Sequence, residues 1–434
     1  MRRKSIAIIG AQWGDEGKGK AVDLLTKLAQ TRVDSKSDSD GTSGKPILVR
    51  RYQGSNNAGH TLVADGVKYA LHLTPSGVLI PEAYNLIGQQ VFVNPRAAME
   101  EFKGLMEMGV AVSSNNLGIA ANAHVTLDYH VDEDSKYFEN ENRTSTGKGV
   151  AQTARDKQAR VGIRLVEFLD KDTFKEALEK KFHGNYLMKW SLDPIVESYK
   201  EEREFLAKFL VQEHEINKLH GSQFEIWEGA QGIMLDVDAG EYPWTTSSNP
   251  SFIPGKTDLR LGIFKLYTSS AGTGGRPFVG QMDGELESRV REPWYEFGTT
   301  TALPRDVGWF DAAAARYAIE SAGIDYMAGT CGDKMELLAG IGEKVKLLVG
   351  YKKGSRIFNE WDASFHKRGF LRDAEPVFEE FEPWEKFSKD GELTSNAQRY
   401  ADRIEELTGK EFIMYGTGPG RDEIILKENL WDLY

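Results

Sequence analysis

Short apolar runs alternate with amphipathic segments along this chain. The runs at 5–9 and 46–50 predict buried strands, and a helix is predicted from near Ala21 between them. Helical periodicity recurs at 96–108, 172–184, 196–219, 311–322 and 397–408, and strand-like apolar runs recur at 224–227, 263–268, 345–349 and 411–415. This alternation predicts an α/β fold with a mostly parallel central sheet flanked by helices.

Two polar stretches interrupt this pattern. The Ser/Asp-rich run at 34–41 predicts an exposed loop. The acidic and aromatic stretch at 375–385 predicts a solvated face with a few anchoring rings. The sequence contains no internal repeat and no heptad run, and no sharp change of composition marks a domain boundary.

Composition narrows the class of protein. The chain has 434 residues, of which 40% are hydrophobic and 28% charged, as is typical of a large soluble globular protein. Its net charge of −12 argues against a broad surface for nucleic acid or anionic membranes, so we expect small phosphorylated ligands. The single cysteine, Cys331, excludes an internal disulfide and a cysteine metal cluster. Few apolar residues precede Gly10, so we expect no signal peptide or membrane span there, and a cytoplasmic protein.

The segment Gly10–Lys20 follows the first apolar strand and leads into the first helix. Glycines at such a position let backbone N–H groups converge on an anion at the positive end of the helix, which predicts a phosphate cradle. The segment differs from the usual P-loop because Gly19 follows Lys18 and because Asp15 and Glu16 lie within it. A carboxylate facing bound phosphate is costly unless it holds Mg²⁺ or moves a proton. The alternative is an ordinary glycine-rich turn between a strand and a helix.

A lone histidine lies in a second turn of small and amide residues, at 51–61. By itself His60 is more simply interpreted as a packed histidine, since one histidine has no diagnostic spacing. Together with the first loop it suggests a division of labour. Asp15 would remove a ring proton while His60 donates a hydrogen bond to the oxygen that becomes part of a leaving group.

Further polar clusters lie beyond other predicted elements. They are Ser145–Val150 with Arg155, Lys157, Arg160 and Arg164; the segments at 227–232, 236–238 and 242–249; Gly298–Arg305; Thr330–Asp333; and Gly416–Arg421. The first cluster suits a phosphomonoester, or is a solvated basic helix. The amide- and hydroxyl-rich segments suit a purine and its sugar phosphate, or are turn-rich loops. Three threonines and one arginine in Gly298–Arg305 suit a small dicarboxylic acid, and the last two clusters follow strands where doubly wound sheets bind ligands.

These motifs, in this order, resemble the adenylosuccinate synthetase family nearly end to end. The specific matches are Gln12–Lys20, Asn57–Thr61, Glu228–Gly232, Thr246–Asn249 and Gly298–Thr301. The resemblance implies one elaborated P-loop-NTPase-like domain over 1–434 with loop and helical insertions. It also implies a homodimer that uses GTP and Mg²⁺ to phosphorylate the 6-oxygen of IMP, after which L-aspartate displaces the phosphate.

The resemblance also implies roles for individual residues. Asp15 would be the base and a Mg²⁺ ligand with the Gly59 carbonyl, His60 would be the acid, and Gln231 would join them in catalysis. The nucleoside triphosphate would contact Gly14, Glu16, Gly17, Lys18, Gly19, Lys20, Asp333, Gly416 and Gly418. The acceptor nucleotide would contact Asn57, Ser145, Thr146, Gln231 and Thr246, with Arg160 from the partner subunit. L-Aspartate would contact Thr299, Thr300, Thr301 and Arg305.

Two departures from the family pattern concern the acceptor nucleotide. Leu303 stands where the family has an arginine that contacts the ribose 2′-hydroxyl and the aspartate carboxylate. Without that arginine, a bound ribose leaves its 2′-hydroxyl poorly paired, which costs roughly 1–3 kcal/mol of binding free energy. A 2′-deoxyribose has no such hydroxyl and incurs no such cost. The alternative is that the segment shifts and another donor compensates. Ala271, in place of a family valine, leaves room for a 2-amino group.

Together the departures favour dGMP as the acceptor. They resemble phage-type relatives that make N6-succino-2-amino-2′-deoxyadenylate for diaminopurine DNA, although those commonly carry serine where this chain keeps Asp15. Asp333 favours GTP over ATP as the donor, because a carboxylate would face a lone pair on adenine N1. Cys331 and Gly416, which replace a family lysine and serine, weaken that preference. The alternatives are an ordinary synthetase acting on IMP and an inactive nucleotide-binding regulator, and a pure binder needs neither Asp15 nor His60.

Overall fold

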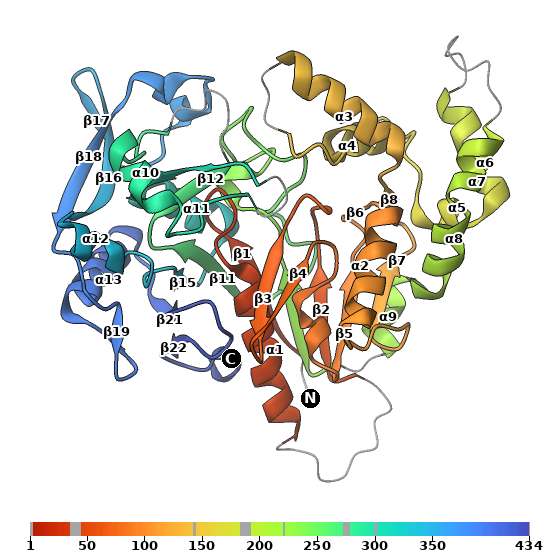
Figure 1. Cartoon of the computed structure of the whole chain (residues 1–434), viewed down its shortest axis with the longest axis horizontal. Helices are drawn as coiled ribbons and strands as arrows, with labels where there is room; N and C mark the ends of the chain where they lie inside the picture. The colour runs from red at the N-terminus through yellow and green to blue at the C-terminus, as the bar shows by residue number, and fades with distance from the viewer. Residues whose placement is uncertain are drawn as a thin grey trace. The chain divides into compact units, whose positions relative to one another are not determined.

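The structure is a computed structural model, and it describes residues 3–34, 45–141, 145–182, 192–219, 222–271, 278–298 and 302–433. These residues form two compact units, each built from separate segments of the chain. Unit 1 comprises Met1–Ser5, Leu25–Gly59 and Leu71–Glu228, and unit 2 comprises Ile6–Leu24, His60–Ala70 and Gly229–Tyr434. The ten strands of the central sheet are divided between the two units (Figure 1). The prediction of one elaborated domain stays a prediction, and most of the predicted loop at 34–44 lies outside the described residues.

Unit 1 contains five parallel strands of the sheet. In order they are β10 (Phe224–Glu228), β2 (Ile47–Arg51), β5 (Ala83–Ile87), β7 (Leu117–Ala120) and β9 (Leu210–Val211). Every residue of β10, β2 and β5 is buried, as expected of parallel strands covered on both faces. Unit 1 also contains a short parallel pair of strands, β6 (Phe92–Val93) and β8 (His124–Val125).

The helices of unit 1 follow local signals in the sequence. Helix α2 (Pro95–Glu107) begins where the Asn94 side chain accepts a hydrogen bond from the backbone N–H of Ala97, and proline occupies its first position. The other helices are α3 (Asp128–Glu141), α4 (Val150–Gln158), α5 (Leu165–Leu169), α6 (Lys171–Phe182), α7 (Asp193–Ser198), α8 (Lys200–Leu206) and α9 (Glu213–Leu219). Helices α5, α6, α7 and α8 cluster together (Figure 1). Short 3₁₀ turns cover Ser76–Leu79 and Ala207–Phe209.

The prediction of one long helix over 196–219 is wrong. The structure places α7, α8, a 3₁₀ turn, β9 and α9 in this region. The physical reason is a tertiary one, because Leu210 and Val211 pair with Ile119 and Ala120 and extend the edge of the sheet. Backbone pairing with β7 outweighs the helical periodicity of the side chains there.

Unit 2 contains the other five strands, in the order β22 (Ile424–Leu426), β21 (Phe412–Gly416), β15 (Tyr326–Thr330), β11 (Leu259–Lys265) and β1 (Lys4–Gly10). All the pairs in this half are parallel except β21 with β22. Helix α1 (Lys18–Asp34), whose residues from Leu25 on belong to unit 1, begins three residues before the predicted start near Ala21. Because β1, β11 and β15 run in the same direction, their carboxyl ends and the loop after β1 meet at one edge.

Smaller sheets and helices complete unit 2. The strands are β3 (His60–Ala64) with β4 (Val67–Leu71), β12 (Thr268–Ala271) with β13 (Arg305–Gly308), β19 (Ser388–Lys389) with β20 (Glu392–Leu393), and a sheet of β14 (Phe310–Asp311), β16 (Val345–Lys353), β17 (Arg356–Phe358) and β18 (Glu375–Phe381). The helices are α10 (Gly284–Arg291), α11 (Ala312–Ala322), α12 (Glu336–Ile341) and α13 (Ser395–Thr408). Four 3₁₀ turns cover Ile233–Leu235, Ala363–His366, Phe370–Asp373 and Leu430–Asp432.

The predicted strand at 263–268 is displaced in the structure. Strand β11 ends at Lys265, where its pairing with Thr330 of β15 ends, and a separate strand, β12, begins at Thr268. The acidic stretch at 375–385 agrees better with its prediction. Strand β18 is exposed or half-buried along its length, and the Trp384 ring beyond it is buried.

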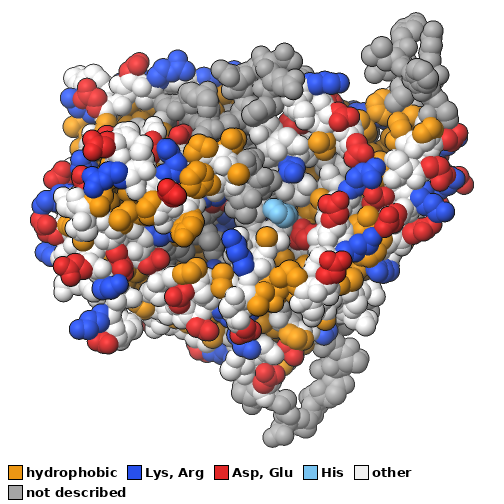
Figure 2. Space-filling view, in the orientation of Figure 1, with side chains coloured by type: hydrophobic (Ala, Val, Ile, Leu, Met, Phe, Trp, Pro, Cys, Tyr) orange, Lys and Arg blue, Asp and Glu red, His pale blue; other side chains and the backbone are white. Residues whose placement is uncertain are grey.

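Positive and negative side chains are mixed on the face of the molecule that Figure 2 draws, with Lys and Arg interspersed among Asp and Glu. Among the described residues, no helix is both long and apolar enough to cross a membrane.

Candidate active site

The loop between β1 and α1 is held in shape by a buried carboxylate. Glu16 is fully buried and accepts hydrogen bonds from the backbone N–H groups of Gln12 (3.1 Å) and Gly14 (2.9 Å). Its other oxygen accepts from the Lys18 ammonium at 2.6 Å. The Thr330 hydroxyl, at the end of β15, donates to the backbone carbonyl of Glu16 at 2.7 Å. Glu16, which was predicted to contact the nucleotide, therefore braces the loop from inside.

Two glycines allow this close packing. A Cβ at Gly10 would lie 2.3 Å from the Gln231 carbonyl oxygen and 2.5 Å from a Glu16 carboxylate oxygen. A Cβ at Gly232 would lie 2.2 Å from the Gln12 carbonyl oxygen and 2.4 Å from the other Glu16 oxygen. The structure therefore brings Gln231 and the loop after β1 together, and it leaves no room for a side chain between them.

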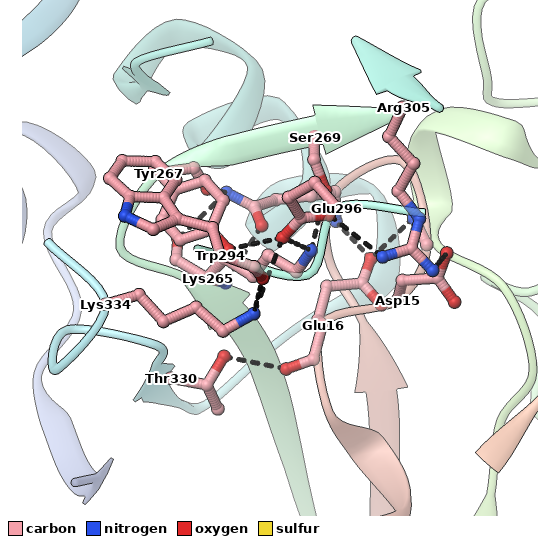
Figure 3. Close-up of polar contacts among 12 residues, drawn as sticks. Asp15, Glu16, Lys265, Tyr267, Ser269, Trp294, Glu296, Arg305, Thr330 and Lys334 are labelled. Carbon is pink, nitrogen blue, oxygen red and sulfur yellow. Dashed lines mark hydrogen bonds and ion pairs between the residues drawn. The ribbon is translucent and has the colours of Figure 1, made fainter. Parts of the chain in front are cut away.

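The carboxylate predicted to be the base projects from the same loop. Asp15 has a φ of 60°, between Gly14 and Gly17 with φ values of 91° each. Its side chain is 37% exposed and pairs with an Nη atom of Arg305 at 2.7 Å (Figure 3). Asp15 was predicted to be the base and Arg305 to contact L-aspartate, and the structure brings these two residues together.

Arg305 is held from its other side by Glu296, which the sequence analysis missed. The second Nη atom of Arg305 donates to Glu296 at 2.9 Å, and Lys265 donates to the same carboxylate at 2.7 Å. The Tyr267 hydroxyl also donates to Glu296, and Lys334 lies 3.8 Å from it (Figure 3). The only signal in the sequence was a carboxylate two residues before the Gly298–Arg305 cluster. It had no periodicity to connect it with Lys265 or Tyr267.

The cations around Glu296 decide its charge. Burial works against the ionised carboxylate, but Lys265, Arg305 and Lys334 outweigh burial and hold the pKa of Glu296 far below its usual range. Burial also works against the charge of Arg305, but Asp15 and Glu296 raise the pKa of its guanidinium. Burial, with Glu296 beside it, raises the pKa of the Tyr267 phenol, so this group stays a hydrogen-bond donor.

Four of the residues predicted to contact the donor nucleotide lie near the carboxyl ends of β15 and β21: Lys20, Asp333, Gly416 and Gly418. The Lys20 ammonium donates to the carbonyl oxygens of Gly418 (2.6 Å) and Glu423 (2.8 Å). Burial lowers the pKa of Lys20 and raises the pKa of Asp333, and these two charged groups interact. A Cβ at Gly416 would lie 3.7 Å from the Lys20 ammonium. Lys20, which was predicted to contact the nucleoside triphosphate, therefore supports the loop after β21.

Other residues of unit 2 that were predicted to belong to the site include His60, Thr246 and Leu303. His60 is buried at the first position of β3. The backbone N–H of Thr246 donates to the Leu235 carbonyl at 2.7 Å. Leu303 is 49% exposed. Thr299, Thr300, Thr301 and the side chain of Ala271 lie outside the described residues.

Five predicted residues belong to unit 1. Asn57 and Gly59 are half-buried in the segment after β2, and Arg160 is exposed after α4 with a φ of 63°. Ser145 and Thr146 precede α4, and the Ser145 hydroxyl donates to Asp134 at 2.7 Å.

The donor chemistry of the loop fits Mg²⁺ held jointly with phosphate. Among the described residues, no group of three or more His, Cys, Asp or Glu side chains forms a metal cage. Asp15 offers one partly exposed carboxylate in the loop that was predicted to cradle phosphate. Mg²⁺ commonly takes one or two carboxylates and completes its shell with substrate phosphates and water, so a single carboxylate at this position suits it.

Comparisons with known proteins agree over almost the whole chain. A family model described as adenylosuccinate synthetase matches residues 7–425. Two adenylosuccinate synthetases are similar to this chain over nearly its whole length. The one from Caldanaerobacter subterraneus subsp. tengcongensis is 37% identical and covers 97% of this chain, and the one from Bacillus cereus is 36% identical and covers 99%. Each match covers 99% of the relative.

Solved structures give the same picture for the fold. A fully ligated adenylosuccinate synthetase from Plasmodium falciparum matches with a TM-score of 0.83 and 27% identity, covering 98% of this chain and 99% of that chain. The succinoaminodeoxyadenylate synthetase of cyanophage S-2L, bound to dGMP and dATP, matches with a TM-score of 0.59 and 16% identity over 98% of this chain and 96% of that chain. At that identity the second likeness shows a shared fold and does not place the chain in the phage-type branch.

Proposed function

Since this chain belongs to the adenylosuccinate synthetase family of C–N bond-forming ligases, we propose that it joins L-aspartate to C6 of IMP with hydrolysis of GTP. The observation that carries the proposal is the pairing of Asp15, on a phosphate-cradle loop, with Arg305. This pairing supports the proposal, because the proposed base would lie beside the cation proposed to bind a carboxylate of L-aspartate. IMP is preferred to dGMP because relatives that carry the name adenylosuccinate synthetase cover 97–99% of the chain.

The site residues divide the work between two steps. Asp15 accepts the N1 proton of the purine as the 6-oxygen attacks the γ-phosphorus of GTP and GDP leaves. His60 donates a hydrogen bond to the transferring phosphoryl group. The amine of L-aspartate, with a carboxylate held by Arg305, then attacks C6, and inorganic phosphate leaves. Asp15 and the Gly59 carbonyl would hold Mg²⁺, which would neutralise charge on the phosphates.

A second candidate acceptor is dGMP, and one observation favours it. The Leu303 side chain is aliphatic and 49% exposed, so it offers no hydrogen bond to a ribose 2′-hydroxyl. Purified protein with GTP, Mg²⁺ and L-aspartate should be given IMP, GMP, dIMP or dGMP in turn. We expect turnover of IMP; turnover of dGMP with none of IMP would replace IMP by dGMP in the proposal.

The Leu303→Arg variant tests the sugar preference directly. A guanidinium at this position restores a donor for the 2′-hydroxyl, so we expect kcat/KM for IMP relative to dIMP to rise by roughly 5- to 100-fold. The matched control is Leu303→Met, which changes shape without adding a donor. An unchanged ratio in both variants would show that Leu303 does not read the sugar.

We also propose that the chain is a homodimer in which Arg160 reaches the acceptor nucleotide of the partner subunit. Asp15→Asn and Arg160→Ala should each inactivate the enzyme alone. Mixing them under exchanging conditions should restore about a quarter of wild-type activity, because half of the dimers are mixed and each has one intact site. A mixture that forms mixed dimers but stays inactive would place Arg160 in its own subunit's site or outside it.

A further inference from the structure

The segment between Phe297 and Pro304 is closed at its base by one pair of residues. The backbone N–H of Arg305 donates to the Glu296 carbonyl at 2.9 Å, and the guanidinium of Arg305 donates to the Glu296 carboxylate at 2.9 Å. Above this pair, Phe297 and Pro304 form an antiparallel bridge. Glu296 thus fixes both the main chain and the side chain of Arg305.

We propose that Glu296 is a positioning residue that sets the guanidinium of Arg305 for the carboxylate of the amino-acid substrate, an inference that rests on the proposed function. The chain of contacts is continuous. Glu296 holds one Nη atom of Arg305, and the other Nη atom reaches the partly exposed Asp15 at 2.7 Å. The Arg305 Nε is buried without a hydrogen-bond partner. Arg305 therefore has one Nη atom held by Glu296 and the other on Asp15 in the loop after β1.

The two oxygens of Glu296 have separate partners. One accepts from Arg305, whereas the other accepts from Lys265 and Tyr267 and lies 3.8 Å from Lys334. Lys265 donates in turn to the Ser269 hydroxyl at 2.6 Å. Because all these partners are donors, an amide at this position cannot satisfy both sides. Whichever way it turns, its NH₂ group faces a donor.

Glu296 also removes a conflict among like charges. Lys265 and Arg305 are 3% and 7% exposed, and Lys334 is 25% exposed, so three cations converge where little water screens them. Without a carboxylate among them these cations would repel one another. Arg305, whose other Nη atom pairs with the partly exposed Asp15, would then shift from its position.

The test compares Glu296→Gln with Glu296→Asp and with a matched control. We expect Glu296→Gln to raise the KM for L-aspartate about 10- to 100-fold, while the KM values for IMP and GTP change by less than about threefold. Glu296→Asp keeps the charge and should recover part of the loss. The control is Glu225→Gln, which removes another buried carboxylate that holds arginines, Arg3 and Arg50, in unit 1. It should lower Tm and leave the KM for L-aspartate unchanged.

A second readout does not depend on the ligase reaction. Arg305 is buried in the wild type, so we expect phenylglyoxal to modify it slowly. In Glu296→Gln we expect phenylglyoxal to modify Arg305 faster, and mass spectrometry measures both rates. If the wild type makes no product but Arg305 becomes reactive in the variant, the proposed function fails and the positioning role of Glu296 stands. If Glu296→Gln lowers Tm while the KM for L-aspartate and the reactivity of Arg305 stay at wild-type values, Glu296 is structural only and the proposal is overturned.

Discussion

Asp15→Asn is expected to lower kcat by about 10²- to 10⁴-fold, because an amide cannot accept the proton that the purine must lose as its 6-oxygen is phosphorylated. The substitution also removes the negative charge that pairs with Arg305 and that is proposed to hold Mg²⁺, but it keeps the backbone of the loop. Asparagine tolerates the left-handed conformation that Asp15 adopts at a φ of 60° and still accepts a hydrogen bond from Arg305. Steady-state kinetics with IMP, GTP and L-aspartate give the measurement.

The control for this experiment is Asp390→Asn. Asp390 is also an exposed aspartate in the left-handed region, with a φ of 53°, but it lies in the turn between β19 and β20. We expect kcat and Tm of this variant to match the wild type. Because the Asp15 side chain is 37% exposed, Asp15→Asn should also keep its Tm within a few degrees. A kcat for Asp15→Asn within about tenfold of the wild type would remove Asp15 from the role of base.

Gly10→Ala is expected to damage both stability and nucleotide binding. Its Cβ would lie 2.3 Å from a backbone oxygen of Gln231, 2.5 Å from Glu16 and 2.7 Å from the Lys18 ammonium. The backbone cannot yield cheaply, so we expect the free energy of unfolding to fall by about 1–3 kcal/mol. We also expect kcat/KM for GTP to fall by about 100-fold, because the loop must shift relative to the phosphates. Denaturant unfolding and kinetics measure the two effects.

Gly104→Ala is the matched control for this prediction. Gly104 lies in α2, where an added Cβ meets nothing within 4 Å. Alanine there should stabilise the protein by up to about 1 kcal/mol, because it favours the helix more than glycine does. Wild-type stability and GTP kinetics in Gly10→Ala would mean that the loop after β1 does not need the close contact between Gly10 and Gln231.

Local patterns predicted much of the fold. Strand β1, helix α2 and helix α13 lie close to their predicted ranges, because each has a strong apolar pattern or a clear start signal. The failures at 196–219 and 263–268 have a common cause. In both, pairing with a strand distant in the sequence decides where an element ends, and β9 and β11 stop where their partners β7 and β15 allow.

Some residues of the candidate site could be predicted from the sequence, and others could not. Glycines, carboxylates and lysine close together in the chain marked the loop after β1, and resemblance to a family supplied the role of Asp15. Glu296 escaped notice because its partner Lys265 is 31 residues away and has no regular spacing to it. The functions of Glu16 and Lys20 also changed once their partners were known, since both support loops from within the protein.

The sequence by itself determined the α/β class and the family and predicted a phosphate cradle after β1, because these depend on residues that are neighbours in the chain or on motifs in a fixed order. Only the tertiary structure decided that Asp15 faces Arg305 and that Glu296 holds Arg305 among buried cations. The physical reason is that charge pairing depends on distance and burial in space, and neither is encoded in local spacing.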